Sequence, residues 1–270
     1  MYLNNLVIEI TRRCNMLCSH CLRGEAQNKY ISDKTLQKFF FKIRDSFIGT
    51  LTITGGEPSL APSRIRAIRQ HAIWNRVRFN SFYIVTNGKK LSKDFINAIY
   101  GLQQYCDCPD ECTIQYSSDK FHTRALDIDK LEPLEFFQGG KGAIEYYQLI
   151  NEGRAAENYG GRGHELYLDP YVIDKDDIGE GLFYLNSLGN ILPSCDLSYE
   201  SQDNKNMILG NVNDDTFDLF QYAKDWNVKL DEIEAEKKRK EANGTLITFD
   251  HDSIYPSYRA VVNDVINQAA

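Results

Sequence analysis

The chain has 270 residues, of which 42% are hydrophobic, and a formal net charge of −7. This is enough for one sizeable core, since α/β barrels of about 200–250 residues commonly fold as one unit. The negative charge argues against a large nucleic-acid-binding surface, which needs a basic face. No apolar run reaches the roughly 18–20 residues that span a bilayer, and no basic-plus-apolar signal segment leads the chain, so we expect a cytoplasmic protein without a membrane partner.

Short apolar strands alternate with amphipathic segments over the first 120 residues. We predict strands at Leu6–Ile10, Thr50–Thr54, Phe82–Thr86 and Cys112–Ser117. Helices are predicted between them, at Ser32–Phe47, Ser63–Trp74 and Ser92–Leu102, with serine caps at Ser32 and Ser92. Repeated strand–helix units of this length indicate a parallel sheet, either open or curled into a barrel.

The pattern is less regular after residue 120. Leu131–Phe137 is expected to be helical, and Ala143–Leu149 to form a fifth strand, although its two tyrosines leave a helix open. Glu165–Ile173 is expected to be a further strand. A hairpin of Phe183–Leu185 with Asn190–Leu192 and a helix at Asp214–Ala242 are expected to follow.

Three cysteines lie within eight residues, directly after the first predicted strand: Cys14, Cys18 and Cys21, with the spacing C-x3-C-x2-C. Four thiolates would saturate either metal site: a zinc ion takes four of them, and a [4Fe–4S] cluster takes one at each iron corner. Three thiolates leave one corner of such a cluster open for a substrate or cofactor. The spacing therefore indicates an iron–sulfur enzyme, and a zinc site that lacks one ligand is the alternative.

A second group of cysteines, Cys106, Cys108 and Cys112, precedes the fourth predicted strand. This position places the group at the opposite end of a parallel barrel from the loops that follow the strands. Three thiols with acidic neighbours are expected to be free, and a metal that is structural or relays electrons is the alternative.

The other strands end in glycines or polar residues: Thr54-Gly55-Gly56-Glu57-Pro58, Thr86-Asn87-Gly88 and Ser117-Ser118-Asp119. In a parallel α/β barrel the loops after the strands open on one face, and the active site lies there. We therefore expect these segments and the cysteine loop to meet at one place.

The cysteine triad, the Gly-Gly-Glu-Pro after the second strand and the Thr-Asn-Gly after the third together resemble the radical S-adenosylmethionine superfamily, over roughly residues 5–155. The resemblance implies an α/β fold, a partial (β/α)6 TIM-type barrel over residues 1–180. Residues 181–270 would add a small C-terminal hairpin and helices, because Leu188–Cys195 and Leu209–Val212 resemble the accessory domain called SPASM or its shorter relative Twitch. No cysteine follows Cys195, so we expect a remnant without an auxiliary cluster.

The resemblance also implies the cofactors. A [4Fe–4S] cluster on Cys14, Cys18 and Cys21 would bind S-adenosylmethionine, and an electron passed through it would yield methionine and a 5′-deoxyadenosyl radical that abstracts hydrogen from the substrate. The implied cofactor-binding residues are His20, Gly55, Gly56, Glu57, Pro58, Asn87, Ser117 and Arg154. Asp119 and His122 are the candidate catalytic residues, although His122 is equally compatible with a loop histidine without a role.

The expected substrate is a peptide or a small molecule, with an external electron donor such as flavodoxin or ferredoxin. The SPASM-like remnant favours a peptide, and because the barrel begins near residue 1, we expect a separate partner to recruit it. The alternatives are a nucleoside or other metabolite substrate, a glycyl-radical activase, and a non-catalytic iron–sulfur electron-transfer protein. An electron carrier would have no use for Gly55–Pro58, whose resemblance is to a cofactor contact.

Overall fold

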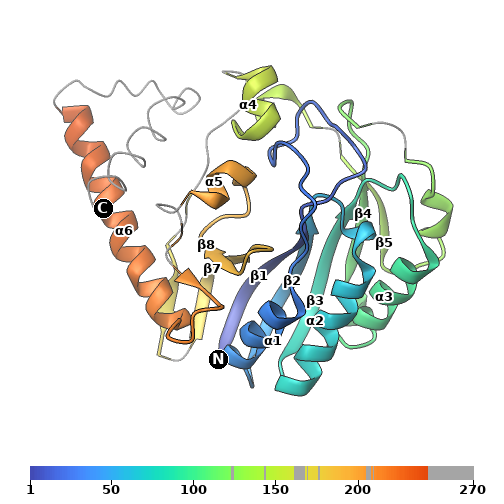
Figure 1. Ribbon diagram of the computed structural model, residues 1–270, viewed down its shortest axis with the longest axis horizontal. Helices are drawn as coiled ribbons and strands as arrows, with labels where there is room; N and C mark the ends of the chain where they lie inside the picture. Colours follow the sequence, from blue (N-terminus) through green and yellow to red (C-terminus); the bar gives the residue numbers. More distant parts are fainter. Residues whose placement is uncertain are drawn as a thin grey trace.

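The computed structural model describes residues 1–122, 125–142, 144–160, 168, 170–175, 177–204, 208 and 210–242 (Figure 1). Its strands are β1 (Tyr2–Thr11), β2 (Phe47–Gly55), β3 (Arg78–Thr86), β4 (Thr113–Ser117), β5 (Phe137–Lys141), β6 (Val172–Asp174), β7 (Asp177–Leu185), β8 (Asn190–Leu192) and β9 (Gly210–Asn211). Its α-helices are α1 (Asp33–Lys42), α2 (Pro62–Asn75), α3 (Lys93–Gln103), α4 (Gly153–Tyr159), α5 (Tyr199–Asp203) and α6 (Leu219–Ala242).

The described strands form one sheet, in the order β5-β4-β3-β2-β1-β7-β8-β9, with β6 beside β7. Neighbouring strands from β5 to β1 are parallel, and β7 is parallel to β1 on its other side. The last strands, β8 and β9, are antiparallel to their neighbours. The sheet curls without closing, which confirms the predicted partial TIM-type barrel with a C-terminal hairpin (Figure 1).

The outer face of the sheet forms the hydrophobic core. Ile8, Ile53, Ile84 and Ile114 pair in one register row across β1 to β4, and each is at most 1% exposed. Helices α1, α2 and α3 cover this face (Figure 1). Burial of one such side chain contributes about 1.5–3 kcal/mol, so this row alone explains why the helices pack here.

The inner face has a different composition, because side chains alternate between the two faces of a strand. The adjacent register row places Val7, Thr52, Tyr83 and Thr113 side by side. Apart from Val7, which is buried, these side chains are half-buried. The alternation of apolar and polar residues in β2 and β3 therefore separates a packed outer face from a polar inner face.

The predicted helix caps are present. The Ser32 hydroxyl accepts a hydrogen bond from the Thr35 backbone N–H at 3.0 Å, and the Ser92 hydroxyl accepts one from Phe95 N–H at 3.1 Å. Each satisfies a backbone donor that the first turn of a helix would otherwise leave unpaired. Helices α1 and α3 consequently begin directly after these serines, close to the predicted starts.

The fifth strand lies earlier than predicted. The expected helix over Leu131–Phe137 is wrong: the segment is a turn that leads into β5. The expected strand over Ala143–Leu149 is also wrong, and Tyr146–Gln148 forms a short 3-10 helix instead. Strand β5 contains Gly139 and Gly140, which give no apolar signal, and a Cβ on Gly140 would lie 2.5 Å from the Ser118 hydroxyl.

The sixth parallel strand also differs from the prediction. Residues 165–167 and 169 of the predicted strand Glu165–Ile173 lie outside the described residues, and its end, Val172 and Ile173, belongs to β6, which is antiparallel to β7. Strand β7 takes the sixth parallel position and turns at Asn186–Gly189 into β8, which confirms the predicted hairpin. Because β7 crosses residue 180, the sheet is continuous there, and the proposed division into two domains stays a prediction.

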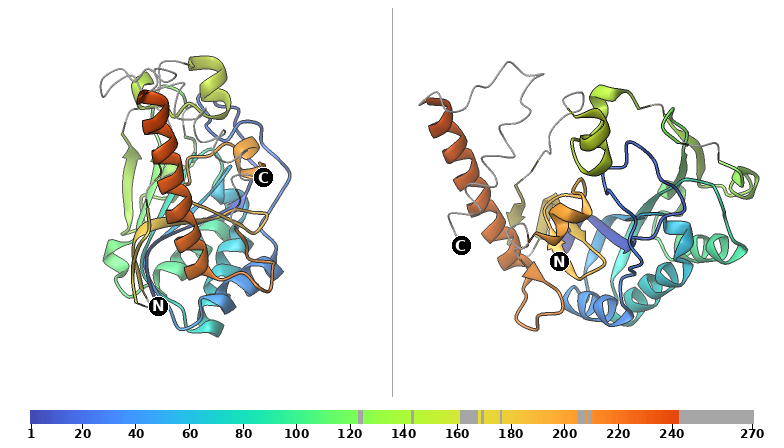
Figure 2. Two further views of the ribbon diagram at one scale, coloured as in Figure 1. Left: turned by 90° about the vertical axis from the view of Figure 1, so that its left-hand side faces the viewer. Right: turned by 45° about the horizontal axis from the view of Figure 1, so that its top comes forward.

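Helix α6 lies along the β7 end of the sheet (Figure 2). Its Tyr222 ring contacts the rings of Tyr171 and Phe183, with centroids 5.9 Å apart in both pairs. The predicted helix over Asp214–Ala242 is thus confirmed, with a later start at Leu219. None of the helices in the described part of the chain combines the length and the apolar character that a membrane crossing requires.

Candidate active site

The cysteine loop after β1 is attached to the end of β2 through backbone hydrogen bonds. Gly56 N–H donates to the Thr11 carbonyl oxygen and Glu57 N–H to the Arg13 carbonyl oxygen, both at 2.8 Å. A Cβ on Gly55 would lie 2.3 Å from the Thr11 carbonyl oxygen, and one on Gly56 would lie 2.3 Å from that of Arg13. Side chains at these two positions would therefore separate the segments, which is the physical reason for the glycine pair.

Helix α4 supports the other side of the loop. The Arg154 backbone N–H donates to the Cys21 carbonyl oxygen and its side-chain Nε to the Cys18 carbonyl oxygen, both at 2.9 Å. Gly153 has a φ of +51°, and a Cβ there would lie 2.4 Å from the Leu22 carbonyl oxygen. Arg154 thus donates to two backbone carbonyl groups of the loop, and Gly153 allows the close approach. Sequence reasoning missed this supporting role.

The three thiols of the loop, Cys14, Cys18 and Cys21, are free and half-buried. Burial, followed by the charges of Cys21 and Cys14, raises the pKa of Cys18 to about 11. Burial, with Glu57 and Cys21, also raises the pKa of Cys14. The thiols therefore lie near enough to affect one another, and without a metal Cys14 and Cys18 stay protonated near neutral pH. Soft thiolates are the ligands that iron–sulfur clusters and zinc prefer, so the donor set fits a cluster.

Glu57 joins the ends of β2 and β3. Its carboxylate is 2% exposed and accepts hydrogen bonds from Ser59 N–H at 3.0 Å, the Thr86 hydroxyl at 2.6 Å and Asn87 N–H at 2.8 Å. These three donors would be left unpaired without it. Glu57 therefore has a structural role besides the cofactor contact, which stays a prediction.

Two further predicted residues lie in the same junction. Pro58 begins the 3-10 helix η1 (Pro58–Leu60) and is buried. The Asn87 side chain donates to the Asn15 side-chain oxygen at 2.8 Å and so contacts the cysteine loop directly. The ends of β1, β2 and β3 thus meet, as expected.

The end of β4 reaches the loop through His20, Asp119 and His122. His122 Nδ1 lies 2.8 Å from an Asp119 carboxylate oxygen, and the His20 ring lies 4.6 Å from the His122 ring and 4.7 Å from that of Phe121. Burial and the nearby His122 lower the pKa of His20 to about 4, so His20 is neutral near pH 7. Its buried Nδ1 has no partner among the described residues, which leaves it available to a ligand.

Ser117 ends β4 on the inner face, where it pairs with Lys141 of β5. All four strand ends and α4 therefore converge on the cysteine loop. The second cysteine group lies at the opposite end, as expected: Asp107 N–H donates to the carbonyl oxygen of Phe79 near the start of β3, at 2.9 Å. That its thiols are free, with a bound metal as the alternative, stays a prediction.

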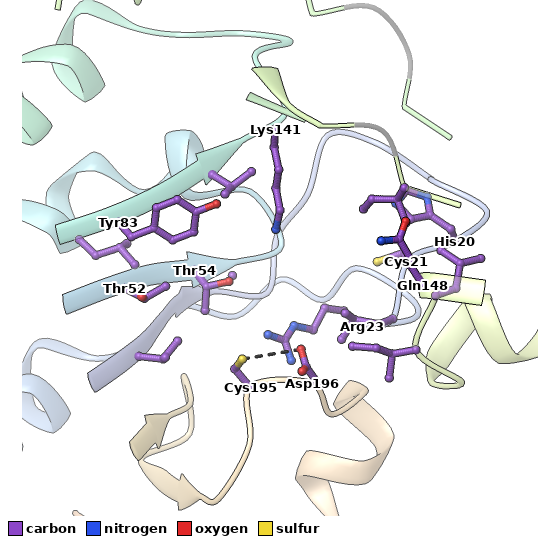
Figure 3. A pocket seen from close by; sticks show the side chains of 18 residues that line it. His20, Cys21, Arg23, Thr52, Thr54, Tyr83, Lys141, Gln148, Cys195 and Asp196 are labelled. Carbon is purple, nitrogen blue, oxygen red and sulfur yellow. Dashed lines mark hydrogen bonds between the residues drawn. The ribbon is translucent and has the colours of Figure 1, made fainter. Parts of the chain in front are cut away.

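A cavity of about 430 Å³ lies between the cysteine loop and the inner face of the sheet (Figure 3). Thr52, Thr54 and Tyr83 line it from β2 and β3, and Cys21 from the loop. Cys195, for which the sequence suggested only a structural remnant, also lines it. The cavity therefore lies next to the cysteine loop, on the polar inner face of the sheet and not on the face that forms the hydrophobic core.

A buried ionic network behind the cavity joins the loop to the C-terminal part of the chain. Glu9 accepts hydrogen bonds from Arg12 Nε at 3.0 Å and from the Tyr184 hydroxyl at 2.6 Å, and all three residues are fully buried. Burial raises the pKa of Glu9, but Arg23 and Arg12 lower it overall. Sequence reasoning missed this network, although two charged residues in and beside an apolar strand were the available signal.

No protein-family model and no curated protein sequence matches the chain. Among solved structures it is similar to anSMEcpe with bound AdoMet, at a TM-score of 0.54 and 11% identity over 100% of this chain and 97% of that one. It is also similar to native anSMEcpe with bound AdoMet and the Cp18Cys peptide, at a TM-score of 0.52 and 12% identity over 99% and 96% of the chains. At this identity the likeness shows the fold, the curled α/β sheet of these proteins.

Proposed function

We propose that this chain is a radical S-adenosylmethionine enzyme, with a [4Fe–4S] cluster on Cys14, Cys18 and Cys21. The observation that carries the proposal is the direct attachment of the cysteine loop to Gly55-Gly56-Glu57 by backbone hydrogen bonds. The two motifs form one structural unit beside a cavity. A zinc site or an electron carrier requires the thiols but gives no reason for this unit or for the cavity.

The bound cluster would supply one electron to S-adenosylmethionine, whose sulfonium–carbon bond would break to give methionine and a 5′-deoxyadenosyl radical that takes a hydrogen atom from the substrate. Arg154 and the glycine pair would keep the loop in place. His20, neutral and with a buried unpartnered nitrogen, would contact the adenine, and Asp119 and Ser117 would offer oxygens to the ribose or the amino acid moiety.

The substrate would be a peptide or a small molecule that enters the cavity beside Cys21. The fold likeness to anSMEcpe, which was solved with a bound peptide, supports a peptide, and a metabolite is the alternative. Residues 181–270 would be a SPASM-like remnant, and an external donor such as flavodoxin or ferredoxin would reduce the cluster in the cytoplasm.

The test is anaerobic reconstitution of the full chain with iron and sulfide, then incubation with S-adenosylmethionine and dithionite. We expect about four irons per chain and formation of 5′-deoxyadenosine, measured by mass spectrometry. Cys18→Ala should lose both, whereas Cys108→Ser, at the opposite end of the barrel, should retain both. Zinc at the loop, or an intact cluster that never yields 5′-deoxyadenosine, would refute the proposal.

A further inference from the structure

Lys141 places a positive charge in the cavity. It ends β5, and Figure 3 shows its side chain extending from β5 into the cavity. Its ammonium group has no ion-pair partner within the described residues. Neighbouring lysines differ: Lys120 pairs with Glu145 at 2.6 Å and Lys130 with Asp127 at 2.8 Å. Within the described part of the chain, the charge of Lys141 is therefore available to a ligand.

Arg23 supplies a second cation from the opposite wall (Figure 3). Its Nη1 donates to the Leu197 carbonyl oxygen at 2.7 Å, and the guanidinium lies 5.1 Å from the centre of the Tyr184 ring. Burial alone would lower the pKa of Arg23, but Tyr184 and Glu9 raise it overall, so it stays charged. Among the described residues its other N–H groups have no acceptor, which leaves them free to bind an anionic oxygen.

Asp196, beside Arg23, is the only acidic residue among the described residues that line the cavity. Its carboxylate accepts a hydrogen bond from the Cys195 thiol at 3.6 Å. Among the described residues that line the cavity, one carboxylate faces two cations, and Glu9, outside this lining, balances part of the Arg23 charge. The wall formed by the sheet contributes Thr52, Thr54 and Tyr83 together with the apolar Val7 and Val85. This combination suits a ligand with anionic oxygens, because charged donors bind such groups more strongly than neutral ones do.

We propose that the substrate of this cavity carries a carboxylate or a phosphate group, bound by Lys141 with Arg23 as the second cation. The inference rests on the proposed function, since it concerns the same site. The alternative is that Lys141 binds the carboxylate of S-adenosylmethionine itself. The experiment below distinguishes binding of the substrate anion from binding of that carboxylate.

Binding is measured by isothermal titration of the full chain, with and without reconstituted cluster and S-adenosylmethionine. The probes are glutarate for a carboxylate, glycerol 3-phosphate for a phosphate, and uncharged glutaramide as the control. We expect at least one anion to bind and glutaramide not to bind. Lys141→Gln should raise the Kd of that anion at least about tenfold, as the loss of a charged hydrogen bond predicts.

Lys34→Gln, an exposed lysine on α1, is the matched control and should leave the Kd unchanged. Lys141→Gln should also leave S-adenosylmethionine binding unchanged. Equal binding of glutaramide, no effect of Lys141→Gln on the anion, or weaker S-adenosylmethionine binding in that variant would each overturn the inference. Because titration needs no turnover, anion binding without 5′-deoxyadenosine formation would instead refute the proposed function alone.

Discussion

Gly56→Ala tests whether the glycine pair positions the cysteine loop. The new methyl group would lie 2.3 Å from the Arg13 carbonyl oxygen and 3.0 Å from that of Arg12. Both atoms belong to the backbone, so no side-chain rotation can relieve the contact, and the loop must move away from the end of β2.

The expected cost follows from the two backbone hydrogen bonds that cross this junction, Gly56 N–H to Thr11 and Glu57 N–H to Arg13. A buried donor left unpaired costs about 1–3 kcal/mol, so the pair predicts about 2–6 kcal/mol. This is a large fraction of the roughly 5–15 kcal/mol by which domains are stable. We therefore expect lower stability together with loss of the cluster.

The assay is urea unfolding monitored by circular dichroism. Iron content after anaerobic reconstitution is the second readout. Gly101→Ala, within α3, is the matched control. Its Cβ would meet only the end of the flexible Arg69 side chain, at 3.4 Å. Alanine in a helix interior is favoured over glycine by about 0.5–1 kcal/mol, so this variant should be equally or more stable. A Gly56→Ala protein with wild-type stability and full iron would refute the reasoning.

Three other substitutions probe the loop and the buried network. Cys18→Ala should abolish the iron–sulfur absorbance, because two thiolates hold a cluster poorly; absorbance at the wild-type level would contradict this. Arg154→Leu should form a cluster but lose it to EDTA about 10–100-fold faster, since the Cys18 carbonyl group loses its donor, and an unchanged decay rate would argue against this support. Glu9→Gln should lower the unfolding free energy by about 3–5 kcal/mol near neutral pH, because buried arginines lose their counter-charge. The pKa of Glu9 is lower in the folded protein than its ordinary value of 4.5. The difference in unfolding free energy between wild type and variant should therefore persist above pH 4.5 and shrink as the pH falls through the folded pKa. Urea titrations at several pH values measure it, and a pH-independent difference would oppose the assignment.

Features encoded by a few neighbouring residues could be predicted from the sequence. Ser32 and Ser92 cap their helices because a serine hydroxyl reaches a backbone N–H three residues on. The convergence of the cysteine loop with Gly55-Gly56 and Asn87 was also predictable, because the carboxyl ends of parallel strands share one face.

Strand β5 could not be placed in this way. Phe137–Lys141 has two central glycines, and what makes it a strand is its backbone pairing with β4, from Ile114 to Ser117. Hydrophobic periodicity reports side-chain burial, so it gives no signal for a segment that backbone hydrogen bonds define.

By itself, the sequence determined the local chemistry: three thiols at C-x3-C-x2-C spacing, a glycine pair after a strand, and the alternation that gives the sheet a packed and a polar face. Only the tertiary structure decided that β7 lies beside β1, where Tyr184 reaches Glu9, and that Lys141 and Arg23 face one cavity. The physical reason is separation along the chain, since these partners lie more than a hundred residues apart. No local spacing rule relates them until the sheet has formed.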